Sequence, residues 1–99
     1  MAPRKVNLFV NDIPIPIEDF VQEFIENVIT GMLTVLKGTV EIKDVHLYIK
    51  GDIVEINLNN ALVPVNPFAN KFIRNTVVGM VSSLKGVGQI NKLKISIMG

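Results

Sequence analysis

Apolar and polar residues alternate along four stretches of the chain, which is the pattern of a β-strand with one buried face. These stretches are residues 5–10, 44–50, 54–58 and 92–98. The dipeptides at positions 11–12, 51–52 and 59–60 consist of Asn, Asp and Gly, the residues that close two-residue hairpins. The pattern therefore predicts antiparallel strands whose aliphatic side chains share one face.

Two apolar segments that contain proline, residues 13–17 and 61–65, follow the first and third of these strands. If each folds back as a hairpin, its aliphatic residues lie on the same side as those of the preceding strand. Pro14, Pro16 and Pro64 then fall at positions where the missing N–H group points outward, as at the edge of a sheet. An extended apolar loop is the alternative, and the sequence leaves open whether these segments are strands.

Each proline-containing segment is followed by apolar residues at helical spacing. They are Phe20, Phe24, Ile25, Val28, Met32, Val35 and Leu36 in the first stretch, and Phe68, Phe72, Ile73, Val77, Met80, Val81 and Leu84 in the second. Asn66 before Pro67 predicts an N-cap with proline in the first turn. A lysine followed by glycine, at Lys37 and Lys85, predicts the end of each helix. We therefore expect two helices whose apolar residues cover the apolar face of the sheet.

The whole pattern occurs twice, because residues 6–51 align with residues 54–99 without a gap. Of the 46 aligned positions, 15 are identical. This tandem 48-residue repeat predicts two copies of one supersecondary unit, related by an approximate twofold axis, that bury a shared core. The length suits one small domain, so we expect residues 1–99 to form a single domain.

The predicted fold class is α+β, a two-layer sandwich of a mostly antiparallel sheet with two helices on one face. Without the proline segments the order is β-α-β-β-α-β, which resembles the ferredoxin-like arrangement, the nearest analogy. With them the order is β-β-α-β twice, and the extra strand occupies an edge of the first strand that the ferredoxin-like order gives to another strand. The sequence does not decide between these orders. A likeness at the level of the fold implies no function.

Gly31 and Gly79 occupy equivalent positions inside the two predicted helices. Each costs about 1 kcal/mol relative to alanine in a helix interior, so a structural reason is expected. The close approach of a helix to its twin or to the sheet is one reason, and alanine should then overpack the contact. A glycine that faces a ligand is the alternative.

Composition narrows the possible chemistry. The hydrophobic content of 48% and charged content of 19% are those of a globular chain. Cysteine is absent, which excludes disulfides, thiolate metal sites and cysteine nucleophiles, and His46 is the only histidine. We therefore expect no cofactor and no metal site. No apolar run approaches the roughly 18–20 residues of a membrane span. No signal peptide is recognisable, so we expect a cytoplasmic protein without a membrane partner.

Catalytic motifs are not found either. The sequence contains no glycine-rich phosphate loop, no nucleophile elbow and no paired histidines. Glu23 and Glu26 could converge on one helix, but Lys71 and Arg74 occupy the equivalent positions in the second half. A solvated helix face explains them better than paired-carboxylate chemistry. An enzyme is therefore less well supported than a non-enzymatic protein, although the sequence leaves the question open.

The polar face of the predicted sheet is the candidate interaction surface. Its candidate residues are Phe9, His46, Tyr48, Glu55, Asn57 and Lys94. A cleft that contains His46 and a buried carboxylate would favour small-molecule binding or catalysis. A continuous positive stripe through Arg4, Lys5, Lys92 and Lys94 would favour nucleic acid, but the net charge of +1 argues against that partner.

The two halves of the chain differ strongly in charge. Residues 6–51 contain seven acidic and three basic residues, a net charge of −4, whereas residues 54–99 contain one and five, a net charge of +4. One explanation is ion pairing within the chain, Glu23 with Lys71 and Glu26 with Arg74. The other is a homodimer, because a twofold axis can place each acidic half against a basic one. We predict a non-enzymatic interaction or assembly protein that self-associates; small-molecule binding or catalysis and nucleic-acid binding are the alternatives.

Overall fold

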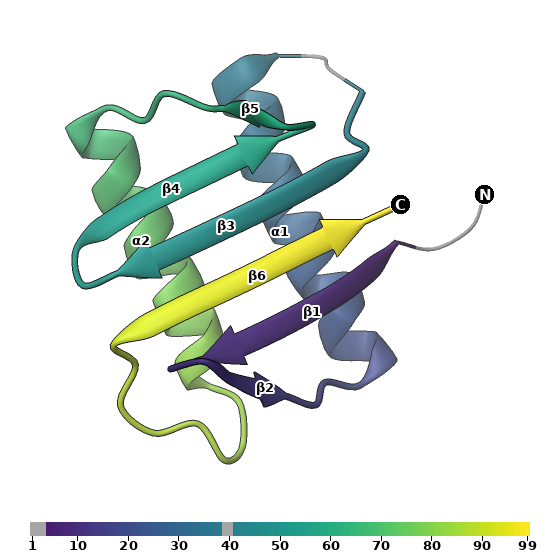
Figure 1. Cartoon of the computed structure of the whole chain (residues 1–99), viewed down its shortest axis with the longest axis vertical. Helices are drawn as coiled ribbons and strands as arrows, with labels where there is room; N and C mark the ends of the chain where they lie inside the picture. The colour runs from purple at the N-terminus through teal and green to yellow at the C-terminus, as the bar shows by residue number, and fades with distance from the viewer. Residues whose placement is uncertain (1–3, 39–40) are drawn as a thin grey trace.

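The computed structural model describes residues 4–38 and 41–99. The elements in those residues are β1 (Lys5–Val10), β2 (Ile13–Ile15), α1 (Asp19–Lys37), β3 (Asp44–Lys50), β4 (Ile53–Leu58), β5 (Ala61–Leu62), α2 (Pro67–Ser82) and β6 (Lys92–Met98). The strands form one antiparallel sheet in the order β2-β1-β6-β3-β4-β5. Both helices cover the same face of this sheet (Figure 1). The predicted two-layer α+β fold is therefore confirmed.

The proline-containing segments form the two outer edges of the sheet. β2 pairs with β1 and places Pro14 opposite Phe9, while β5 pairs with β4. Both strands are shorter than the apolar segments that contain them. The element order is thus β-β-α-β twice. Because β2 takes the outer edge of β1, the arrangement differs from the ferredoxin-like order. The closing strands β3 and β6 lie side by side at the centre.

Two hairpin turns hold residues with positive φ. The φ angles are 53° at Asn11, 67° at Asp12, 51° at Asn59 and 68° at Asn60. Two consecutive positive values are typical of a type I′ turn, whose twist matches that of the adjoining strands, and Asn and Asp tolerate them best after glycine. The local sequence therefore determines where each hairpin turns.

The first residue of each of these turns also connects the two halves of the chain. The Asn11 side-chain oxygen accepts hydrogen bonds of 2.8 and 2.9 Å from backbone N–H groups at the start of β6, and its amide donates to the Gln89 carbonyl at 2.8 Å. Asn59 forms the equivalent bonds, of 2.8 and 3.0 Å, at the start of β3 and donates to the Glu41 carbonyl at 2.7 Å. Each asparagine thus positions the closing strand of the other half.

The hydrophobic core lies between the helices and the sheet. On the sheet side, the core consists of every second residue of the strands, as the sequence predicts. The helix residues that are buried against them are Ile25, Ile29 and Leu33 in α1, and Ala69, Ile73, Val77 and Val81 in α2. These positions recur every four residues, so one side of each helix faces the sheet.

Four phenylalanines expected on this covering side are instead on the solvent side of the helices. Phe20 is 69% exposed, Phe24 55%, Phe68 77% and Phe72 57%. The helix geometry explains the difference, since Phe20 precedes the buried Ile29 by nine positions, about half a turn of displacement around the axis. The prediction that these phenylalanines cover the sheet is therefore wrong.

Gly31 and Gly79 do not mark a close contact within the chain. Among the residues that the structure describes, a Cβ atom built on either glycine meets no heavy atom within 4 Å outside its own helix turn. Both positions are exposed and lie on the same side as the phenylalanines. The prediction of close packing against the other helix or the sheet is therefore wrong, and alanine at these positions would overpack nothing in this chain.

The two helices end differently. α1 ends at Lys37, followed by Gly38 with a φ of 81°, as predicted. α2 ends at Ser82, earlier than the Lys85 end that the sequence predicts. The hydroxyl groups of Ser82 and Ser83 donate to the Gly79 carbonyl at 3.0 and 2.9 Å. Serine side chains that bond to nearby backbone compete with the helical pattern, which explains the early end.

Candidate functional site

One exposed stripe runs along the outer side of each helix, opposite the core. Its residues are Phe20, Phe24, Asn27 and Gly31 on α1, and Phe68, Phe72, Asn75 and Gly79 on α2, and we call these two sets the outward stripes. The spacing of four, three and four residues keeps each set on one face of its helix. All eight side-chain positions are exposed, and the residue types are the same on both helices. The core does not require this identity, because none of these positions is part of it.

The phenylalanines of each outward stripe pack on one another at the surface. The ring centroids of Phe20 and Phe24 are 5.7 Å apart in an edge-to-face arrangement, with an interplanar angle of 67°. Those of Phe68 and Phe72 are 6.1 Å apart with an angle of 33°. Aromatic pairs at these separations attract each other modestly, but most of their area remains in water. Such a cluster of exposed large apolar side chains is typical of an interaction site.

An apolar groove lies between the C-terminal end of α1 and the N-terminal end of α2. Its volume is about 390 Å³, and its lining includes Met32, Val35, Leu36, Phe68 and Phe72. Val35 is 86% exposed. The position equivalent to Val35 in the second half is Ser83, directly after the end of α2, so the opposite end of the helical layer is less apolar. The groove extends the apolar surface that the outward stripes begin.

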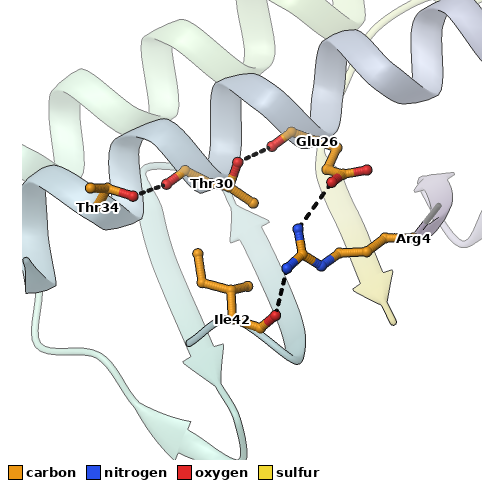
Figure 2. Close-up of polar contacts among 5 residues, drawn as sticks. All are labelled: Arg4, Glu26, Thr30, Thr34 and Ile42. Carbon is orange, nitrogen blue, oxygen red and sulfur yellow. Dashed lines mark hydrogen bonds and ion pairs between the residues drawn. The ribbon is translucent and has the colours of Figure 1, made fainter. Parts of the chain in front are cut away.

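Glu26 does not pair with α2. The Arg4 guanidinium donates to the Glu26 carboxylate at 3.0 Å and to the Ile42 carbonyl at 2.7 Å, so it joins the start of β1 to α1 and to the segment before β3 (Figure 2). Further along α1, the Thr30 and Thr34 hydroxyls donate to carbonyls one turn earlier, at 2.7 and 2.9 Å (Figure 2). Arg4 therefore has a structural partner on the helical side, away from the open face of the sheet.

Arg74, the equivalent of Glu26, is also held locally. Its Nε donates to the Gly51 carbonyl at 2.7 Å and lies 3.4 Å from the Asp52 carboxylate. Glu23 and Lys71 are exposed and form no ion pair among residues 4–38 and 41–99. The suggested pairing of acidic α1 residues with basic α2 residues inside the chain is therefore wrong. The charges of Glu23 and Lys71 remain available at the surface.

The six residues of the predicted interaction surface lie together on the open face of the sheet. Phe9, Lys94, Tyr48 and Glu55 are consecutive neighbours in one row across β1, β6, β3 and β4. His46 and Asn57 are opposite each other in the next row. The Lys94 Nζ lies 5.0 Å from the Phe9 ring centroid and 6.0 Å from that of Tyr48, within range of a weak cation–π attraction.

A shallow hollow of about 400 Å³ adjoins this row. Its lining includes Phe9, Tyr48, Lys50, Lys92 and Lys94, but neither His46 nor a buried carboxylate. The three lysines gather at one end of the open face, and Lys50 lies directly opposite Lys92. Lys5 lies at the other end of β1. The features that would favour catalysis or a continuous nucleic-acid track are therefore not found in the described part of the chain.

Other chemistry is equally sparse in residues 4–38 and 41–99. No three His, Asp or Glu side chains there are grouped as metal ligands. Every buried side-chain nitrogen or oxygen in the same residues has a hydrogen-bond partner. Neither described helix combines the length and the apolar character that crossing a membrane requires.

The outward stripes are the surface that sequence reasoning missed, although a signal for them exists. Ile25, Ile29 and Leu33 already form a complete buried stripe, so Phe20 and Phe24 are additional to the residues that one helix side needs for burial.

Comparison with protein-family models, with curated proteins and with solved structures found no match.

Proposed function

We propose that this protein is a non-enzymatic assembly protein that forms a homodimer through its helical face. The observation that carries the proposal is the pair of outward stripes, with four phenylalanines that are each more than half exposed. Exposed aromatic area is unfavourable in water, and clusters of it in folded proteins are usually covered by a partner. Aromatic side chains also supply much of the binding energy of protein interfaces.

The helical face is large enough for a stable dimer. The molecule measures 35 × 35 × 18 Å, and the helices form one of its two broad faces, which lies behind the sheet in the view of Figure 1. A specific interface needs about 800 Å² from each partner, which a face of this size supplies. The apolar groove beside Val35 adds contact area at one end of that face.

A second copy of the chain fits this face because the face carries both charges. Glu23 lies beside the phenylalanines of α1, and Lys71 lies beside those of α2. A partner that offers basic residues to α1 and acidic residues to α2 has the charge pattern of this same face. Association through the sheet edges is less favourable, since β2 and β5 are short and Pro14 occupies one of them.

The test is the mass of the protein in solution over a range of concentrations, by light scattering coupled to gel filtration. We expect a dimer, and we expect Phe20→Ser combined with Phe68→Ser to raise its dissociation constant at least about 100-fold, because buried aromatic anchors often contribute 2 kcal/mol or more each. At concentrations where both proteins are monomeric, the thermal melt should change little, since both rings are mostly exposed in the monomer.

The matched control is Ile53→Ser. Ile53 is 68% exposed, like the phenylalanines, but it lies on the open face of the sheet. Its replacement should leave the dissociation constant unchanged. A protein that is monomeric at every concentration, or a dimer weakened as much by Ile53→Ser as by the phenylalanine variants, would overturn the proposal.

A further inference from the structure

We infer that each α1 packs antiparallel on the α2 of the second copy, with the phenylalanine rings of one outward stripe over the glycine of the other. This inference rests on the proposed function, because it specifies which helices meet when two helical faces associate. It also gives a role to Gly31 and Gly79, which the fold of the single chain does not explain.

The shape of the outward stripes favours antiparallel packing. On each helix the two rings lie toward the N-terminal end, and the glycine lies eleven positions after the first ring, about 16 Å along the axis. When two such stripes face each other antiparallel, rings meet glycine at both ends. Within residues 4–38 and 41–99, no neighbouring side chain or element lies within 4 Å of a Cβ built on Gly31 or Gly79, so a ring from outside can rest on the helix backbone there.

Shape alone allows two dimers. α1 and α2 lie side by side and run in opposite directions (Figure 1). Because their outward stripes are the same, a dimer axis parallel to the helices places α1 on the partner's α2, whereas an axis across the helices places α1 on the partner's α1. Both arrangements set rings over glycines equally well.

Charge distinguishes the two dimers. With α1 on α1, Glu23 would lie close to the partner's Glu23, and Lys71 close to the partner's Lys71. With α1 on α2, each glutamate lies near a lysine instead. Like charges at an interface oppose association, and unlike charges favour it and fix the register. Neither residue has an ion-pair partner within residues 4–38 and 41–99, so both charges are free to act between copies.

The chain contains no cysteine, so single introduced cysteines can report which helices meet. Asn27→Cys and Asn75→Cys place one thiol near the middle of each outward stripe, at exposed positions. After subunit exchange, a short bis-maleimide should join Asn27→Cys protein to Asn75→Cys protein and leave either variant alone uncrosslinked. Mass spectrometry separates the products, and Glu55→Cys on the open sheet face gives the background from random collision.

Each result is decisive. A mixed cross-link at least tenfold above the background supports packing of α1 on α2. Cross-linking of Asn27→Cys protein with itself, or a stable dimer without a cross-link above the background, overturns this packing but leaves the proposed dimer standing. A protein that is monomeric by light scattering, with no cross-link, overturns both proposals.

Charge reversal gives a second measurement. With α1 on α2, Lys71→Glu should weaken the dimer on the order of 3- to 10-fold at low salt, and Glu23→Lys added to it should restore the affinity. With α1 on α1, Lys71→Glu exchanges one like-charged pair for another, so the affinity would not fall. An unchanged affinity in the single variant therefore overturns the inference. Glu26 and Arg74 are left unaltered because they hold contacts within the chain.

Discussion

Gly31 and Gly79 are residues whose effect on the stability of the monomer differs from their expected effect on the dimer. Both lie inside a helix and are exposed, where alanine is more favourable than glycine by about 1 kcal/mol. In the described part of the chain nothing outside the helix lies within 4 Å of either position, so the missing side chain gives these residues no better packing. Their use on both outward stripes is explained if a second copy approaches the helix backbone there.

Alanine at these glycines should therefore have opposite effects on two measurements. Gly31→Ala and Gly79→Ala should each raise the free energy of unfolding by about 1 kcal/mol, measured by urea denaturation at concentrations where the protein is monomeric. Combined, they should weaken the dimer, because a methyl group lifts the facing ring away from the helix. A lower stability of the monomer would instead indicate a contact within the chain, and an unaltered dimer would remove the role of the glycines in the interface.

At the scale of the elements, the two type I′ hairpins are held by asparagine side chains as well as by their backbone. Asn59 and Asn60 both have positive φ, but among the described residues only Asn59 uses its side chain to form hydrogen bonds, at the start of β3. Glycine tolerates positive φ, so replacing either residue by glycine removes the side chain without straining the turn. The two positions therefore form a matched pair.

We expect Asn59→Gly to lower the free energy of unfolding by about 2 kcal/mol, since it removes three hydrogen bonds at a partly solvated site. Asn60→Gly should change it by less than about 0.5 kcal/mol, as surface substitutions away from such contacts do. Thermal and urea unfolding of both variants measure the difference. Equal effects of the two substitutions would mean that the asparagine bonds contribute little to the position of β3.

The elements themselves were largely predictable, but which side of each helix is buried was not. Alternation placed the strand side chains correctly, because the period of two assigns every residue to a face. That same rule brought Phe9, Tyr48 and Lys94 together on the open sheet face. The apolar side of α1 is wider than the part that is buried, with Ile25, Ile29 and Leu33 along one edge and Phe20 and Phe24 along the other, so periodicity alone does not say which edge faces the sheet. The side that is buried is the one whose β-branched and leucine side chains pack against the sheet.

On the scale of the whole molecule, the halves of the chain are interleaved. β1 pairs on its inner side with β6, from the other half, and β3 pairs with β6 and β4. β1 and β3, which belong to the same half, are not neighbours. The asparagine side chains also connect the two halves: Asn11 of the first half bonds to the start of β6, and Asn59 of the second half bonds to the start of β3. The sheet therefore depends on contacts between segments that are distant in the sequence.

This interleaving makes the protein a candidate for fragment complementation. Cleavage at the Gly51–Asp52 turn would give two peptides, each with a hairpin, a helix and a closing strand that has no neighbour of its own. Each peptide alone should be unfolded as a monomer, because half of the sheet and half of the core would be missing. Mixed in equal amounts, the two should recover the circular dichroism spectrum of the intact chain, with their opposite charges speeding the encounter. A single peptide that folds as a monomer would contradict this view. We therefore expect the two halves to fold only together, as one cooperative unit, even when no peptide bond joins them.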